Sequence, residues 1–250
     1  MFIPTGLVRY AVAILGVVLF AAGSAQAQGI DGSLHDLATG VNDNNEICVY
    51  CHTPHASNTA VEAPLWNKPA NTTTYTTYDS TTIDGDILAV GSVSLACLTC
   101  HDGTQAMDTV VNAPGSGAGA GTIGSGIGTL PPAAITNLGV DLTNDHPIGV
   151  QYSGFGTTPI DPDFKVAPDL QVATINTVQR WWVDTAVGTA GTREKTDMIL
   201  YTRDNTANGG AAEEPFVECA SCHDPHNNAA GTFLRISNTN SDVCLACHVK

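Results

Sequence analysis

Eight cysteines fall into four copies of one spacing, in which two cysteines flank two other residues and a histidine follows at once. Thiols three positions apart lie about one helical turn from each other, so both can add to the vinyl groups of one porphyrin while the adjoining imidazole reaches its iron. This C-x-x-C-H pattern is typical of covalent c-type haem attachment. We therefore predict four covalent haem c groups with their irons, bound at Cys48, Cys51 and His52 (site one), Cys97, Cys100 and His101 (site two), Cys219, Cys222 and His223 (site three), and Cys244, Cys247 and His248 (site four).

A single C-x-x-C-H could also be half of a zinc site or a redox dithiol. Four copies leave no cysteine over, and a zinc ribbon gives no reason for a histidine after every pair. The motif count, together with the export signal described below, therefore favours haem.

The remaining histidines equal in number the iron positions that the motifs leave open. If every iron takes a second imidazole, the distal ligands are His35, His55, His146 and His226. All axial positions would then be filled, which disfavours a reductase because such an enzyme needs an open iron for its substrate. Met107 lies close enough to site two in the sequence to be an alternative ligand there.

The four sites alternate in type along the chain. Sites one and three read C-x-x-C-H-x-P-H, whereas sites two and four read C-L-x-C-H. Residues three apart span at most about 10 Å, so His52 and His55 cannot hold one iron from both sides. We therefore predict two haem pairs, in which His55 binds the iron of site two and His226 binds the iron of site four. His35 and His146 then remain for sites one and three.

Residues 1–27 have the pattern of a secretory signal peptide. Arg9 precedes an apolar run from Ala11 to Ala22, and Ala25-Gln26-Ala27 forms a small-residue cleavage site. The apolar run is short for a membrane anchor, and export agrees with haem attachment outside the cytoplasm. We predict a tetrahaem domain over 28–250, with the first haem pair in 28–149, a haem-free spacer in 150–215 and the second pair in 216–250.

The predicted fold class is a loop-rich multihaem cytochrome c with low secondary structure and a haem-packed core. We expect short helices at the C-x-x-C-H sites and a few short β-strands. Residues 112–128 are rich in Gly, Ala and Ser and predict a flexible loop. Residues 171–184 predict a strand or a short helix, and 197–203 predict a strand, so a small sheet could separate the haem pairs.

The formal charge of −15 arises from 24 acidic against 9 basic side chains. Such a charge disfavours nucleic acids and anionic membranes as partners and is compatible with basic ones. It also helps to keep an exported protein in solution.

Short sequence segments along most of the chain resemble multihaem c-type cytochromes of bacteria that respire extracellular acceptors. Within that group the chain is most similar to the tetrahaem OmcE-type cytochromes, which assemble head to tail into extracellular filaments. The resemblance implies bis-histidine haems and a distal histidine near the N-terminus that can come from a neighbouring subunit, a role that His35 matches. The segments are His35-Asp36-Leu37, Cys48 to His55, Pro64-Leu65-Trp66-Asn67, Cys97 to Gly103, Asp145-His146-Pro147, Cys219 to His226, Phe233-Leu234-Arg235 and Cys244 to His248.

The function that the motifs and the resemblance predict is extracellular electron transfer by a homopolymer without enzymatic activity. Its partners would be redox cytochromes or extracellular electron acceptors. A periplasmic tetrahaem carrier is the alternative, because it needs the same haems without assembly, and a multihaem reductase ranks third.

Overall fold

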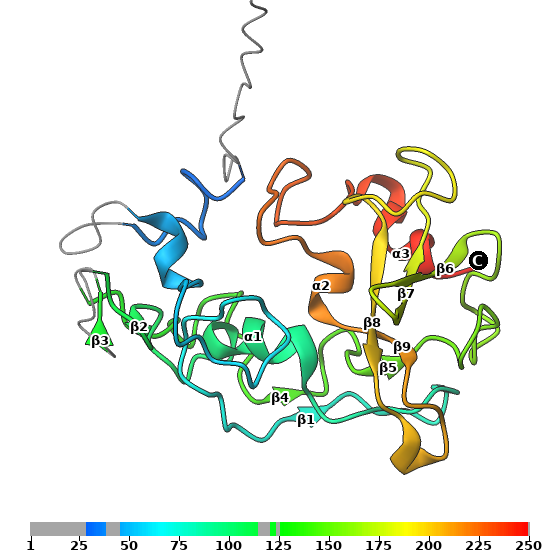
Figure 1. Ribbon diagram of the computed structural model, residues 1–250, viewed down its shortest axis with the longest axis horizontal. Coiled ribbons are helices and arrows are strands. Elements are labelled where there is room, and N and C mark those ends of the chain that lie inside the picture. Colours follow the sequence, from blue (N-terminus) through cyan, green and yellow to red (C-terminus); the bar gives the residue numbers. More distant parts are fainter. Residues whose placement is uncertain (1–28, 39–45, 115–120, 124–125, 250) are drawn as a thin grey trace, which may run out of the picture.

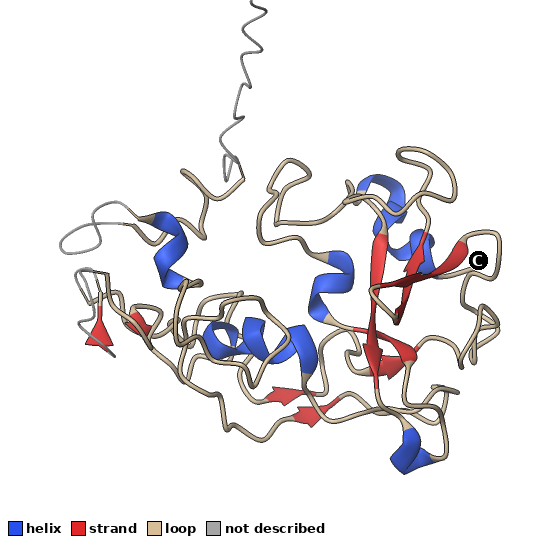
Figure 2. Cartoon of the chain, in the orientation of Figure 1, coloured by secondary structure: helices blue, strands red, loops and turns tan. Residues whose placement is uncertain are grey.

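A short helix lies at each of the four C-x-x-C-H motifs in the computed structural model, which describes residues 29–38, 46–114, 121–123 and 126–249 (Figure 1). These helices are η1 (Ile47–Tyr50), α1 (Ser92–His101), α2 (Cys219–Cys222) and α3 (Asp242–Cys247), and two further turns are η2 (Thr206–Asn208) and η3 (Thr239–Ser241). Long loops join them, as Figure 2 shows. The predicted loop-rich fold with few helices is thereby confirmed, whereas the predicted signal peptide over 1–27 lies outside the described residues.

The largest sheet has five strands and lies within and just after the stretch that carries no haem motif. Its strands are β5 (Val150–Gln151), β6 (Leu170–Ile175), β7 (Val178–Val183), β8 (Met198–Arg203) and β9 (Glu214–Val217). They are hydrogen-bonded in the order β5, β9, β8, β7, β6, and every neighbouring pair is antiparallel. The strand predicted over 197–203 is confirmed by β8, and the sheet is more extensive than the few short strands that the sequence predicts.

A tight hairpin resolves the ambiguity of residues 171–184. β6 and β7 pair from Leu170 with Val183 to Ile175 with Val178. The two residues between them, Asn176 and Thr177, have φ values of 51° and 68°, as a type I′ turn requires. The segment is therefore two strands rather than a single strand or a helix.

The apolar side of this sheet packs against the haem motifs of sites three and four. The buried cluster contains Tyr152, Phe164, Leu170, Trp181, Val183, Met198, Leu200 and Val217, and the half-buried Cys222 and Cys247 pack on it. The Tyr152 hydroxyl lies 3.2 Å from the carbonyl oxygens of both Lys165 and Cys247, to which it can donate a hydrogen bond. The sheet therefore supports sites three and four directly.

Two small ladders organise the other side of the molecule, around sites one and two. β1 (Thr76–Thr77) pairs in parallel with β4 (Asp141–Leu142), and β2 (Thr109–Val110) pairs antiparallel with β3 (Gly121–Thr122). Ile123 follows β3 and is buried in a cluster with Tyr50 and Val110. The prediction of a loop over 112–128 is therefore wrong at 121–123, because Gly121 and Thr122 pair with β2 and Ile123 is buried in the site-one core.

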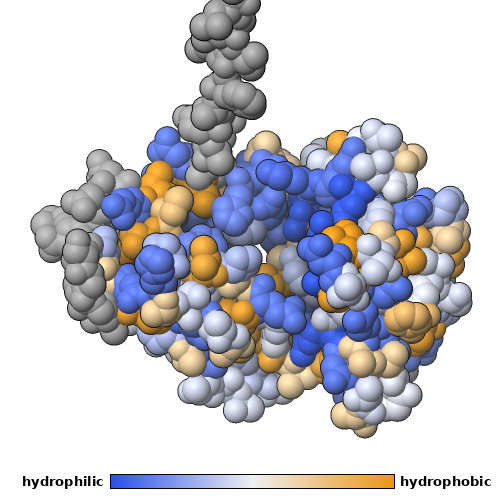
Figure 3. All heavy atoms as spheres, in the orientation of Figure 1, coloured by the Kyte–Doolittle hydropathy of each residue, from blue (hydrophilic) through white to orange (hydrophobic). Residues whose placement is uncertain are grey.

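Polar residues cover most of the face seen in Figure 3, and the surface is hollowed between the α1 side and the α2 side. Within the described ranges, no helix has both the length and the apolar character needed to cross a membrane.

Candidate haem-binding sites

Sites one and three are built in the same way around their C-x-x-C-H turns. In each, the residue after the motif histidine donates its N–H to a later loop, and that loop donates an N–H back to the carbonyl of the second cysteine. Leu65 and Phe233, at the centre of the two loops, both have a φ of 55°, which bulky residues rarely adopt. The hydrogen bonds are Thr53 to Leu65 (2.8 Å), Asn67 to Cys51 (2.8 Å), Asp224 to Phe233 (2.8 Å) and Arg235 to Cys222 (2.9 Å).

Backbone carbonyls of the two returning loops, and one from the segment before β4 at site two, orient three of the motif histidines. The Nδ1 atoms of His52, His101 and His223 lie 2.7, 2.8 and 3.0 Å from the carbonyl oxygens of Pro64, Thr136 and Thr232. A carbonyl only accepts, so each Nδ1 carries the proton and each Nε2 keeps a free lone pair. This is the arrangement in which a histidine binds a metal through Nε2 while a second group fixes its ring.

Site four has a related geometry at the C-terminal end of α3. His248 leaves the helix in an extended conformation, and its ring lies 5.2 Å from that of Phe164. The backbone around it is held by hydrogen bonds from Lys165 to Cys247 (2.8 Å) and from Val249 to Asp163 (2.7 Å). Site four is thereby tied to the loop between β5 and β6.

The thiols of successive sites lie close enough to affect one another. Cys51 of site one interacts electrostatically with Cys100 of site two. Cys97 of site two forms a hydrogen bond with Cys219 of site three. Cys222 of site three interacts with Cys244 and Cys247 of site four. The four sites therefore form one row that follows the order of the sequence.

Most of these thiols are held in their neutral form when no haem is attached. Burial raises the pKa of Cys51 and of Cys222 to about 11, and it also raises the pKa of Cys100 and of Cys247. The hydrogen bond with Cys219 raises the pKa of Cys97 well above its usual value. Neutral thiols are weak nucleophiles, so the folded chain holds these cysteines in a poorly reactive state.

Two of the four candidate distal histidines lie beside motif histidines. The ring of His226 is 5.9 Å from that of His52, and the ring of His35 is 6.1 Å from that of His101, measured between centroids. His226 thus lies next to site one, whereas the alternation of motifs predicts it at site four. Within its own chain His35 lies at site two.

The other two candidates, His55 and His146, make no ring contact with a motif histidine within the described ranges. His146 nevertheless turns its Nδ1 to the Pro147 carbonyl oxygen, at 3.0 Å, which leaves its Nε2 free. The main-chain carbonyl of His55 accepts a hydrogen bond from the Asn112 side chain, so the loop after site one is held while the imidazole stays exposed.

Burial favours the protonation state that binds a metal. It is the main cause that lowers the pKa of His35, and the imidazoles of His101, His226 and His223 lower it further. Burial likewise lowers the pKa of His223. Both rings are therefore neutral at pH 7, and a neutral imidazole is the form that binds iron.

The sequence reasoning missed Lys68, whose only signal is its place two residues after the Trp of the first returning loop. Its side chain is 1% exposed, and its ammonium donates to the carbonyls of Met107 and of Thr109, the latter at 3.1 Å. Burial lowers its pKa, whereas the Cys100 and Cys51 thiols act to raise it. A buried cation therefore lies beside the thiols of sites one and two.

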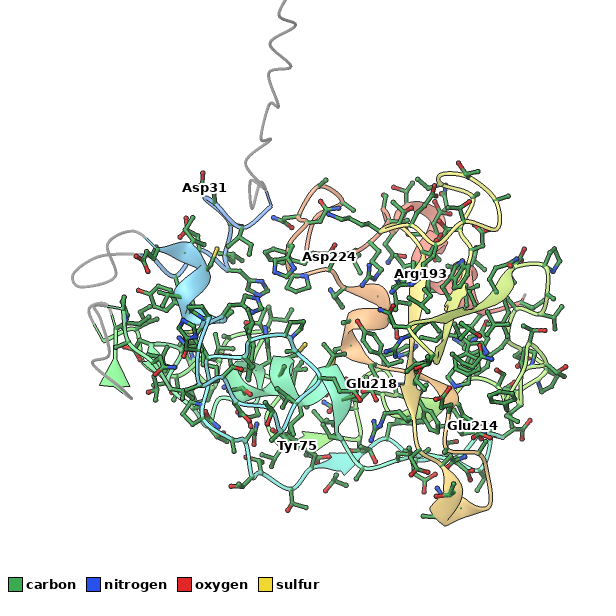
Figure 4. The ribbon with its side chains drawn as sticks, in the orientation of Figure 1. Asp31, Tyr75, Arg193, Glu214, Glu218 and Asp224 are labelled. Carbon is green, nitrogen blue, oxygen red and sulfur yellow. The ribbon has the colours of Figure 1, made fainter. Side chains whose placement is uncertain are left out.

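A second missed feature joins α1 to α2 through Glu218, labelled in Figure 4. Its carboxylate is buried and accepts hydrogen bonds from the Ser94 hydroxyl of α1 and the Arg203 guanidinium of β8. The Ser94 hydroxyl in turn accepts the Cys219 N–H at 2.9 Å. This network therefore fixes the position of site two relative to site three.

Comparison with known proteins supports the assignment of the last two sites. Residues 212–250 match the family described as the doubled CXXCH motif, and this stretch contains sites three and four. The match indicates a multihaem protein like the c-type cytochromes and implies covalent haem c binding and electron transfer. A search of curated proteins found no match.

Proposed function

We propose that the chain is an exported electron-transfer protein that holds four haem c groups, one at each motif. The observation that carries this proposal is the set of three motif histidines whose Nδ1 atoms donate to backbone carbonyls and whose Nε2 atoms stay free for iron. Haem iron, when bound, supplies a one-electron couple between its ferric and ferrous states. The protein residues attach, orient and bury the groups, and thereby tune their potentials.

The donor set of the chain fits haem in two further respects. Every motif has its two cysteines on one short helix or turn, as thioether formation to one porphyrin requires. Among the described residues the buried indole N–H of Trp66 has no hydrogen-bond partner, and Trp66 packs beside His52 at 6.3 Å between ring centroids. Buried donors need acceptors, and haem propionates are acceptors.

We further propose that the row of sites acts as a conduit in a head-to-tail homopolymer. Cys48 and Cys244, at the two ends of the row, are exposed, whereas the cysteines of sites two and three are not. Haems at the ends would thus be accessible to a second copy of the chain, to a redox cytochrome or to an extracellular acceptor. In this proposal the protein transfers electrons and is not an enzyme.

The test is to produce the chain in a host that attaches c-type haem and to measure the intact mass of the secreted protein. We expect the mass of four haems, a fully low-spin ferric spectrum and filaments in electron micrographs. Replacing both Cys48 and Cys51 with Ala should remove the mass of one haem. Fewer than four haems in the unmodified protein would refute the site assignment, and four haems in particles that never assemble would favour the periplasmic carrier. Turnover of nitrite with a high-spin haem would favour a reductase.

A further inference from the structure

Two histidines outside the motifs lie opposite motif histidines at a separation that suits one iron between them. The centroid distances are 5.9 Å for His52 with His226 and 6.1 Å for His101 with His35. A metal–imidazole nitrogen bond is about 2 Å long, and the ring centre lies about 1 Å farther, so two imidazoles on opposite sides of one metal have centroids about 6 Å apart. Both measured distances agree with this value.

The contact of His35 with His101 differs from ring stacking, because the two ring planes lie at 66°. His35 has a stacking partner of its own, because its ring lies on Phe233 at 4.1 Å and an interplanar angle of 16°. The distance from His35 to His101 is 2 Å greater, from the 6.1 Å and 4.1 Å separations. Phe233 therefore supports one face of His35, while the separation from His101 leaves space for an iron.

We propose that His226 is the second axial ligand of the site-one iron and that His35 is the second axial ligand of the site-two iron, both within one chain. This inference rests on the proposed haem function and goes beyond it by naming the partner of each iron. It replaces the pairing that the motif alternation predicts, in which His226 binds at site four and His55 at site two. It also keeps His35 within its own subunit instead of on the haem of a neighbour.

The backbone brings both ligands to their sites through one contact. Gly29 belongs to the segment 29–38, here called the N-terminal arm, which also carries His35. It packs so tightly on the loop after α2 that an added Cβ would lie 2.4 Å from the His226 carbonyl oxygen. The arm that carries His35 and the loop that carries His226 therefore pack as one unit. An open cavity of about 540 Å³ lies at this junction, lined by Gly32, Lys195 and His226 among others.

Asp224 orients the proposed site-one ligand. Its carboxylate accepts the main-chain N–H of His226 at 2.9 Å and lies 3.6 Å from the Nδ1 atom of the same residue. This places the Nδ1 side of the imidazole toward Asp224, which Figure 4 labels on the loop after α2. The Nε2 atom is then the nitrogen available to iron.

The experiment compares the spin state of the ferric holoprotein among single variants by low-temperature EPR. His226→Ala and His35→Ala should each convert one haem of four to the high-spin form without changing the haem mass, and added imidazole should restore the low-spin signal. The matched controls are Asn227→Ala and Leu34→Ala, which change the adjoining residue and should stay low-spin. A high-spin haem in either control, or none in the histidine variants, would overturn the proposal.

The site of the change is found by removing haems one at a time. The high-spin signal of His226→Ala should disappear when Cys48 and Cys51 are also replaced with Ala, and it should persist when Cys244 and Cys247 are replaced instead. The opposite result would restore the pairing predicted from the motif alternation.

Two controls keep this outcome separate from the proposed function. If the unmodified protein lacks four covalent haems by mass, the proposed function fails, whereas a wrong location of the high-spin haem overturns only the pairing. Should a variant not fold, a density map of the unmodified holoprotein decides the same point. Density joining His226 to the site-one iron supports the pairing, and density joining it to any other iron overturns it.

Discussion

Removing the Glu218 carboxylate should lower the free energy of unfolding of the holoprotein more than removing any exposed carboxylate would. Its side chain is fully buried and accepts from both Ser94 and Arg203. Truncating one partner of a buried ion pair costs about 3 to 5 kcal/mol, because the other charge is left without compensation. The Arg203 side chain keeps 16% exposure and a second bond to the Ala89 carbonyl at 3.1 Å, so we expect about 3 kcal/mol for Glu218→Ala.

The assay is guanidinium unfolding at pH 7 followed by far-UV circular dichroism. The control is the double variant Glu218→Leu with Arg203→Met, which removes both charges and should recover most of the loss, since replacing both partners with apolar groups is often nearly neutral. Haem mass should be unchanged in every variant, because no cysteine is altered. A loss below about 1 kcal/mol in Glu218→Ala, or a double variant as unstable as the sum of the singles, would refute the reasoning.

Three further predictions follow from buried groups. Lys68→Met should lower the reduction potentials of the haems at sites one and two by roughly tens of millivolts in a spectroelectrochemical titration, because a nearby cation favours electron uptake, whereas Lys68→Arg should leave them close to the unmodified values. Burial raises the pKa of Glu218 above its usual value of 4.5, although the hydrogen bonds from Ser94 and Arg203 act to lower it. The folded protein therefore holds this proton more tightly than the unfolded chain does. The protonated side chain stabilises the fold below about pH 4.5, and this stabilisation is lost as the pH rises through the pKa of the folded state. The stability of the unmodified protein relative to Glu218→Gln should therefore fall from pH 4 to pH 8, and a flat or rising difference would contradict this. Trp181→Ala should cost about 3 to 5 kcal/mol in denaturant unfolding, because the indole is 1% exposed and its N–H donates to the Gly156 carbonyl at 2.7 Å; a loss under about 1 kcal/mol would show that the sheet core tolerates a cavity there.

The motif residues and their helices could be predicted from sequence because their chemistry is local. Two cysteines that must reach one porphyrin need a helical turn, and each motif has one. β8 was equally predictable, since Met198, Ile199 and Leu200 form a continuous apolar run and are all buried. The β6–β7 hairpin was ambiguous because its turn residues, Asn176 and Thr177, lack the glycine that usually marks a type I′ turn.

The placement of the distal histidines could not be predicted because it depends on contacts between distant segments. The similarity of sites one and three suggested that His55 and His226 have equivalent roles. The structure instead brings the arm before site one against the loop after site three, through the contact of Gly29 with His226 and of His35 with Phe233. Lys68 was missed for the same reason, since its carbonyl partners, Met107 and Thr109, lie 39 and 41 residues away.

The order of the sites has a physical consequence for the proposed conduit. The direct thiol contacts join each site to the next one along the sequence, but the proposed bond from His226, three residues after His223 of site three, to the site-one iron adds a connection between sites one and three that bypasses site two. The Glu218 network lies at the middle step, since Ser94 is on the helix of site two and Cys219 belongs to site three. A change at Glu218 should therefore slow electron exchange between sites two and three while each site keeps its ligands. Exchange between sites one and three, which does not pass through this network, should keep its rate.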